Sequence, residues 1–153
     1  MNTDFNIGSE IVDWVIEPIF ECALPNVVDF RGKPLIILLF SLHCPGCIGR
    51  AIPFANRLVY ENEDKINVIG IHTHFEGPEK TQNELESAKT ELFIRFPYYK
   101  DAGFAETFHI YQAGGTPHWI IVDKNGIIIE SIFGSDPNRA LLRIDLHLKQ
   151  LIL

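Results

Sequence analysis

The residues of this chain best suited to chemistry are Cys44 and Cys47, which are separated by Pro45 and Gly46. A thiolate attacks a disulfide and forms a mixed disulfide with it. A second thiol one helical turn away can then cleave the mixed disulfide and release the product. A C-x-x-C pair can also form half of a structural zinc site, but such a site needs a second pair of ligands. No second C-x-x-C and no matching histidine pair follows. The spacing therefore favours a redox dithiol.

The segments on either side of the motif favour ionisation of Cys44. Residues 35–41 form a continuous apolar run, which is typical of a strand buried on both faces. Residues 48–60 carry apolar side chains at helical spacing. A cysteine at the amino end of a helix faces unpaired N–H groups and the positive end of the helix dipole, and both favour the thiolate. Pro45 suits the first helical turn, and His43 adds positive charge when protonated.

A second feature is Thr116-Pro117, which stands directly before the apolar run 118–123. A proline that opens a strand has no N–H to give to the sheet. A cis Thr116-Pro117 bond would turn the Thr116 backbone toward the dithiol, where it could pair with an incoming peptide. Only about 5–6% of X-Pro bonds are cis, so the sequence alone favours the trans form.

The other elements follow from apolar periodicity and turn residues. Asn125-Gly126 indicates a hairpin, Pro53 a helix kink, and Asp136-Pro137 the start of the last helix. A β-α-β unit followed by a hairpin predicts a mixed sheet with helices on both faces, which is the α/β class. Further strands are expected at 11–16, 66–72, 96–99 and 127–133, and further helices at 78–96, 102–110 and 139–153.

Size and composition fit one globular domain. The chain has 153 residues, of which 46% are hydrophobic, so it can bury a core. We expect a single domain over 1–153, with a β extension over about 6–33 and the core over 34–153. The formal net charge of −7, without basic clusters, argues against nucleic acid and against an anionic membrane surface.

The sequence favours a cytoplasmic protein. No apolar run approaches the ~20 residues that span a bilayer, and the first residues show no basic stretch followed by an apolar segment. A periplasmic protein from which the leader had been removed would look the same.

The chain resembles the thioredoxin superfamily, most closely its TlpA-like and AhpC/TSA-like (redoxin) branch, over nearly its whole length. The segments that carry this resemblance are IGSEIVDWVI near the start, FSLHCPGC (40–47), FPYYKD (96–101) and GGTPHWIIVDKNGIII (114–129). The resemblance implies a thioredoxin fold, with Cys44 as the attacking cysteine and Cys47 as the resolving one. It also implies a cis-proline loop that faces the dithiol and binds substrate.

On this basis we expect a thiol-disulfide oxidoreductase that needs no cofactor and no metal. It would act on protein disulfides and draw electrons from an unidentified donor. The substrate site would consist of Thr116, Pro117, Pro45, Gly46 and His43.

The sequence departs from the family pattern at four positions. His43 replaces a common tryptophan, and Pro53 stands six residues after the second cysteine where five is usual. The acids that relatives carry near the dithiol fall at Leu38 and Arg50. The proton acceptor for Cys47 is therefore unidentified, and the direction of exchange stays open.

Two alternative functions stay open. A peroxiredoxin-like peroxidase would use Cys47 as its reactive cysteine and would carry Thr or Ser three residues before it. Here that position holds Cys44, and Phe40 stands where such enzymes usually carry a proline. A copper-binding chaperone would use both cysteines and a histidine, although copper assembly proteins of this fold usually place three residues between their cysteines.

The remaining candidates are interpreted as structural residues. Cys22 has no partner in sequence and is expected to be a buried small apolar residue. Trp119 and Phe133 are expected in the core. His72 and His74 leave one face of their strand, and with His118 could supply metal ligands. No spacing matches a known ligand pattern, so surface or hydrogen-bonded core histidines are expected instead. The six histidines are His43, His72, His74, His109, His118 and His147.

Overall fold

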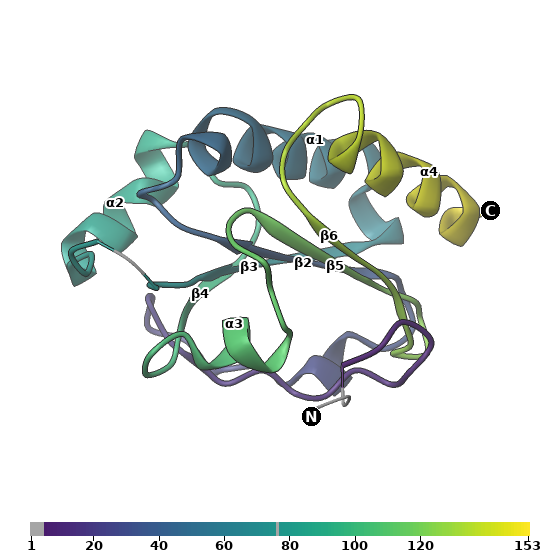
Figure 1. Cartoon of the computed structure of the whole chain (residues 1–153), viewed down its shortest axis with the longest axis horizontal. Helices are drawn as coiled ribbons and strands as arrows, with labels where there is room; N and C mark the ends of the chain where they lie inside the picture. The colour runs from purple at the N-terminus through teal and green to yellow at the C-terminus, as the bar shows by residue number, and fades with distance from the viewer. Residues whose placement is uncertain (1–4, 76) are drawn as a thin grey trace.

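A six-stranded mixed sheet forms the centre of the computed structural model, which describes residues 5–75 and 77–153. The strand order is β1-β4-β3-β2-β5-β6, with β2 parallel to β3 and antiparallel to β5. The predicted mixed α/β sheet is confirmed (Figure 1). The strands are Ile16–Glu17 (β1), Leu35–Phe40 (β2), Asn67–His72 (β3), Tyr98–Asp101 (β4), His118–Val122 (β5) and Ile128–Phe133 (β6).

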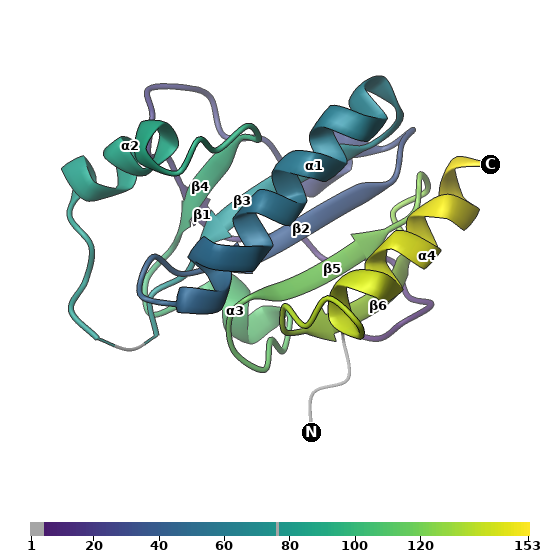
Figure 2. The ribbon, with the colours of Figure 1, turned by 90° about the horizontal axis from the view of Figure 1, so that it is seen from above.

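Helices cover both faces of this sheet, as predicted. Figure 2 shows α1 and α4 lying along the strands on one face, with α2 nearer the β4 edge. The α3 helix and the N-terminal segment lie on the opposite face (Figure 1). The α-helices are Ile52–Asn62 (α1), Gln82–Glu91 (α2), Glu106–Ile110 (α3) and Ala140–Ile152 (α4). Short helices span Val27–Phe30, Cys47–Ala51 and Glu63–Lys65.

Strand β2 joins the two halves of the core. Its side chains alternate between the two faces of the sheet. Ile36, Leu38 and Phe40 pack beneath α1 and α4, whereas Leu35, Ile37 and Leu39 face α3. All six residues are buried. The prediction of a central strand buried on both faces is confirmed, and this strand fixes the point from which residues 41–47 emerge.

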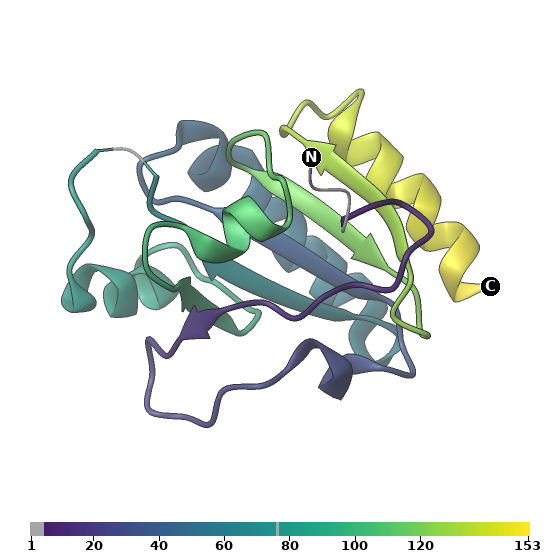
Figure 3. The same ribbon diagram turned by 60° about the horizontal axis from the view of Figure 1, so that its bottom comes forward.

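The N-terminal segment is less regular than predicted. The expected strand over 11–16 is wrong: within the described part of this segment the one strand is the two-residue β1, which pairs with β4, and one isolated bridge joins Glu10 to Ile127. Most of the remaining segment runs without regular secondary structure across the α3 face (Figure 3). Trp14 is buried there, and its indole N–H donates to the Pro25 carbonyl at 2.8 Å.

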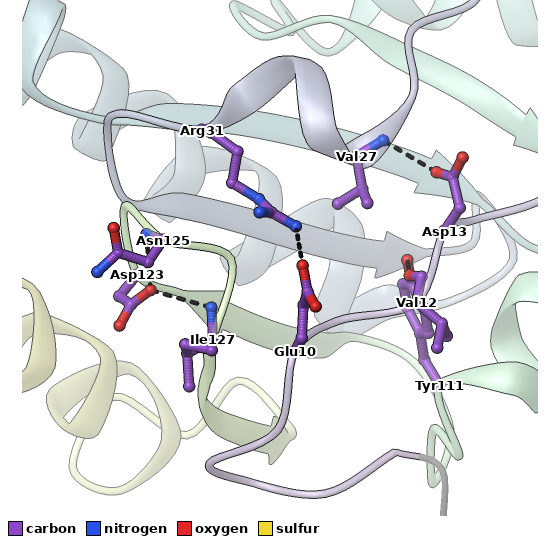
Figure 4. A network of polar contacts seen from close by, with 9 residues as sticks. All are labelled: Glu10, Val12, Asp13, Val27, Arg31, Tyr111, Asp123, Asn125 and Ile127. Atoms are coloured by element: carbon purple, nitrogen blue, oxygen red, sulfur yellow. Dashed lines mark hydrogen bonds and ion pairs between the residues drawn. The ribbon is translucent and has the colours of Figure 1, made fainter.

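Side-chain contacts add to a few backbone hydrogen bonds, such as that from the Ile11 N–H to the Gly126 carbonyl at 2.9 Å, in holding this segment (Figure 4). The Tyr111 hydroxyl donates to the Val12 carbonyl at 2.8 Å, and the Val27 N–H donates to the Asp13 carboxylate at 2.9 Å. Arg31 pairs with Glu10 at 3.0 Å. These contacts depend on residues far apart in sequence, which local periodicity does not report.

Three predicted helices begin later than expected, and one of them is α3, which starts at Glu106 rather than at residue 102. The α2 helix starts after Thr81, whose hydroxyl accepts from the Glu84 N–H at 3.2 Å while Glu84 accepts from the Thr81 N–H at 2.9 Å. The α4 helix starts at Ala140 rather than at Asp136-Pro137. Asp136 instead caps a preceding turn by accepting from the Asn138 N–H at 2.8 Å.

The end of α2 places a phenylalanine in a conformation that favours glycine. The Ile94 N–H donates to the Lys89 carbonyl and the Phe93 N–H to the Thr90 carbonyl, which is a Schellman motif. Phe93 has φ 58° and its ring is exposed. Phe93→Ala and Phe93→Gly both remove the ring, but only alanine keeps a Cβ at this left-handed position.

We therefore expect Phe93→Gly to be more stable than Phe93→Ala by about 1 kcal/mol in urea unfolding. Equal stabilities of the two variants would contradict this account of the helix end.

Candidate active site

The two cysteines lie where β2 passes into a helix. The Cys44 carbonyl accepts from the N–H groups of Cys47 (3.1 Å) and Ile48 (3.2 Å), which opens the helix. The Cys44 sulfur also accepts from the Cys47 N–H at 3.3 Å, so it occupies the place of an N-cap side chain. Cys44 is half-buried and Cys47 is fully buried. One thiol is therefore accessible from solvent and its neighbour faces the core.

The loop before β5 lies against Cys44. The Thr116-Pro117 bond is cis, so the trans form favoured by frequency alone is wrong. The Cys44 thiol donates to the Thr116 carbonyl at 3.3 Å across 72 residues of chain. Gly46 leaves room for the Ser135 side chain, since a Cβ there would lie 2.9 Å from the Ser135 hydroxyl.

The environment of Cys47 holds its proton. Burial raises the pKa of the Cys47 thiol far above its usual range, and the hydrogen bond with Cys44 raises it further. Hydrogen bonds from the Ser41 backbone and the Thr116 side chain act in the opposite direction, because they stabilise the thiolate. No carboxylate of the described residues is among the groups that set this pKa.

The helix after Cys47 contains a wider turn. Residues Cys47–Ala51 form a π-helix, and Pro53 lies in the first turn of α1. The sequence has one residue more than usual between Cys47 and Pro53, and one extra residue is what a π-turn accommodates. The kink expected at Pro53 is thus a widened turn that precedes the proline.

His43 ties the loop after β3 to the motif, and His74 makes a hydrogen bond within that loop. The His43 Nε2 lies 2.6 Å from the Pro78 carbonyl, and the His74 Nε2 lies 2.7 Å from the Gly77 carbonyl. A carbonyl only accepts, so Nε2 is the protonated nitrogen in both rings. His43 therefore borders the accessible thiol while its ring is held by the neighbouring loop.

Two other histidines are buried and hydrogen-bonded. His72 Nε2 accepts from the Leu42 N–H at 3.1 Å, which positions the turn before Cys44. His118 Nδ1 accepts from the Gly114 N–H at 3.3 Å, and its Nε2 lies 2.7 Å from the Ser131 hydroxyl. Within residues 5–75 and 77–153, no group of three or more His, Cys, Asp or Glu side chains could hold a metal ion.

The two buried histidines make stability pH-dependent. Burial lowers the pKa of His72 and of His118 from 6.5 to about 4, and for His72 the charges of His43, His74 and Lys80 lower it further. Between pH 4 and pH 6.5 the unfolded chain therefore binds more protons than the folded protein. The free energy of unfolding falls as the pH falls from 6.5 toward 4. At pH 4.5 the loss is about 2.5 kcal/mol for each histidine.

Urea unfolding at pH 7 and pH 4.5 tests this expectation. In His118→Asn, the amide oxygen can still accept from Gly114 but does not titrate, so we expect the loss on acidification to be smaller by about 2.5 kcal/mol. An identical loss in the wild type and the variant would contradict the argument.

Two residues interpreted from sequence as core are exposed. Cys22 is solvent-exposed and lines a cavity of about 420 Å³ beside Tyr99. Phe133 is 58% exposed at the end of the edge strand β6, and its ring covers Gly115 next to the cis-proline. Trp119 is fully buried, as expected. The sequence gives little sign that Phe133 lies beside the cis-proline, because this position depends on the antiparallel pairing of Phe133 with His118.

The sheet order, the helices on both faces and the cis-proline beside a C-x-x-C turn together define a thioredoxin fold. The model of the AhpC/TSA family matches residues 24–131. The chain belongs to the AhpC/TSA family, as the resemblance of its motifs implied.

Solved structures and curated proteins agree with this assignment. The thioredoxin-like superfamily protein SPOA0173 is 30% identical, with a TM-score of 0.82 over 94% of this chain and 96% of its own. A thiol-disulfide isomerase from Corynebacterium glutamicum is 28% identical, with a TM-score of 0.82 over 95% and 96%. Thiol-disulfide oxidoreductase ResA of Bacillus cereus is 22% identical over 88% of this chain and 74% of its own.

The predicted cytoplasmic location has no support from the comparisons. One protein with the same fold is named the pneumococcal exposed lipoprotein thioredoxin (18% identity, TM-score 0.72, 92% of this chain and 100% of its own). Within the described residues, no helix has both the length and the apolar character needed to cross a bilayer.

Proposed function

We propose that Cys44 and Cys47 form the dithiol through which this thioredoxin-like oxidoreductase reduces or exchanges protein disulfides. The observation that carries the proposal is the position of the Cys44 sulfur. It lies at the start of a helix, accepts from the Cys47 N–H, and donates to the Thr116 carbonyl beside the cis-proline. The thiol-disulfide names of the Corynebacterium and Bacillus relatives support the same activity.

The reaction follows from the different exposure of the two thiols. The Cys44 thiolate attacks one sulfur of a substrate disulfide, and the other sulfur leaves as a thiol after taking a proton. Cys47 then attacks Cys44, which breaks the mixed disulfide and releases the second substrate thiol. The substrate gains two electrons and two protons, and the Cys44–Cys47 disulfide forms. An external dithiol restores the reduced protein.

The surface around Cys44 suits a protein substrate. Pro45 is exposed, the Phe133 ring lies over Gly115 beside the cis-proline, and the His43 ring next to Cys44 is held by the loop after β3. The Thr116 carbonyl accepts a hydrogen bond from the Cys44 thiol in the reduced protein. Once Cys44 has reacted, this carbonyl can accept instead from the backbone of an incoming strand. We propose Thr116, Pro117, Pro45, Gly46 and His43 as the substrate-contacting residues.

The peroxidase alternative is disfavoured by burial. A peroxidatic Cys47 would have to meet peroxide directly, but its side chain is fully buried beneath the helix turn.

Reduction of insulin disulfides by dithiothreitol tests the proposal. The wild-type protein should accelerate insulin precipitation well above the rate with dithiothreitol alone. Cys22→Ser should match the wild type, because Cys22 is exposed and belongs to a different surface. A wild-type rate equal to that of dithiothreitol alone would refute the proposal.

A further inference from the structure

The turn that presents Cys44 is held by a side chain from a neighbouring strand. The Leu42 N–H donates to Nε2 of His72 at 3.1 Å, across 30 residues of chain. Within the turn, the His43 N–H donates to the Ser41 hydroxyl at 3.1 Å, and the Cys44 N–H donates to the Ser41 carbonyl at 3.1 Å. These two short-range bonds shape the turn, and the bond to His72 fixes it to the end of β3.

The His72 ring is itself fixed in place. His72 is the last residue of β3 and is 3% exposed. Its ring meets the Phe40 ring edge to face, with centroids 5.4 Å apart and planes at 90°. The Thr73 N–H donates to the Phe40 carbonyl at 2.9 Å, which joins the end of β3 to the end of β2. The Leu42 N–H therefore points at an acceptor that packing holds still.

His72 acts as an uncharged acceptor. A ring nitrogen that accepts a hydrogen bond carries no proton, so the proton of the neutral ring lies on Nδ1. Burial lowers the pKa of His72 to about 4. The charges of His43, His74 and Lys80 lower this pKa further. Near neutral pH, replacing His72 by an uncharged side chain therefore removes a hydrogen-bond acceptor without removing a charge.

The conformation of this turn determines where the Cys44 sulfur lies. The sulfur accepts from the Cys47 N–H at 3.3 Å, and the thiol donates to the Thr116 carbonyl at 3.3 Å. Both contacts depend on the backbone direction at the end of the turn. Without His72, the half-buried Leu42 N–H would have to find another partner, and the turn would reorient to provide one. The sulfur would then leave its place at the start of the helix.

We propose that His72 is a positioning residue for the attacking cysteine. By accepting from the Leu42 N–H, it holds the turn in which the Cys44 sulfur faces the helix start and the Thr116 carbonyl. This inference rests on the proposed function of the dithiol. His72 acts through the backbone and takes no proton from either thiol, so its effect falls on the rate at which Cys44 attacks a disulfide.

Two uncharged replacements test this role. His72→Gln places an amide oxygen near the former Nε2, whereas His72→Phe keeps a planar ring without an acceptor. All proteins carry Cys22→Ser, so that the exposed third thiol does not contribute. In the reaction of the reduced protein with dithiobis(nitrobenzoate), the first release of nitrothiobenzoate reports attack by Cys44. We expect His72→Phe to slow this phase about tenfold at neutral pH and His72→Gln to restore most of the rate.

Two further readouts distinguish positioning from general stability. The pH at which the first phase reaches half its maximum rate should rise in His72→Phe, because the displaced sulfur is no longer stabilised at the helix start. Hydrogen exchange at the Leu42 amide should be slow in the wild type and in His72→Gln, but fast in His72→Phe. His72→Leu, which is smaller and also lacks an acceptor, takes the place of His72→Phe if the phenylalanine does not fit.

The matched control is Tyr111→Phe. It removes the hydrogen bond from the Tyr111 hydroxyl to the Val12 carbonyl, which is 2.8 Å long and belongs to the core layer on the opposite face of the sheet. This variant should lower the urea midpoint but leave the first phase and its pH profile unchanged. Loss of stability alone would then be excluded as the cause of slow attack in His72→Phe.

A wild-type first phase in a folded, acceptor-free His72 variant would overturn the inference, as would equal slowing by glutamine and phenylalanine. Failure of the proposed function has a different signature. The wild-type protein would then reduce insulin no faster than dithiothreitol alone, while the first phase would still differ between His72→Gln and His72→Phe.

Discussion

Replacing Cys44 by serine should reduce insulin reduction to the rate of dithiothreitol alone. A serine hydroxyl is not ionised near neutral pH and cannot form a mixed disulfide, so no slower route through this position exists. The part of the rate that the protein itself catalyses, after the dithiothreitol background is subtracted, should fall at least a thousandfold. This is the order by which removal of a single nucleophile lowers enzymatic rates. The measurement is the rate of insulin precipitation at equal protein concentration.

The Cys44→Ser variant should remain folded. Cys44 is half-buried, and a serine hydroxyl can still donate to the Thr116 carbonyl that accepts from the thiol. Far-UV circular dichroism and the urea midpoint should therefore match those of the wild type, and Cys22→Ser serves as the active control. A folded Cys44→Ser protein with more than a tenth of the wild-type activity would contradict the role of Cys44.

Replacing Cys47 by serine should separate attack from resolution. Cys44 keeps its exposure and its contact with Thr116, so it still attacks a peptide disulfide, but no second thiol releases the product. We expect a stable mixed disulfide of one peptide per chain and loss of catalytic turnover. Intact-mass measurement under non-reducing conditions detects the adduct, and dithiothreitol should remove it.

The matched control for this trap is the double variant Cys44→Ser/Cys47→Ser. It keeps Cys22, which is solvent-exposed and lines a cavity with Tyr99. The double variant should form no adduct under conditions that saturate Cys47→Ser. Equal adduct formation by the two proteins would assign the reactivity to Cys22 and refute our account of the dithiol.

Sequence reasoning predicted the features that depend on local pattern. The apolar run 35–40 required a strand buried on both faces, and the spacing of Cys44 and Cys47 placed two thiols one turn apart at the following helix. The Asn125-Gly126 pair predicted the β5–β6 hairpin, which the structure contains. These predictions succeeded because each rests on neighbouring residues.

The features that sequence reasoning missed depend on distant contacts. The cis state of Thr116-Pro117 is opposed by its frequency, and only the resemblance to known families implied it. Phe133 was assigned to the core by its apolar type, but it ends an edge strand and lies over Gly115. The hydrogen bond from the Cys44 thiol to the Thr116 carbonyl likewise has no local signal, because only the fold brings these residues together.

Disulfide mapping of the wild-type protein after reaction with a peptide disulfide tests the central claim most directly. The reduced protein is mixed with the oxidised peptide, remaining thiols are alkylated, and the digest is analysed by mass spectrometry. Our account predicts an intramolecular bond between Cys44 and Cys47, with Cys22 alkylated in the same molecules. A bond that includes Cys22, or alkylation of both Cys44 and Cys47 after the peptide has been reduced, would contradict it.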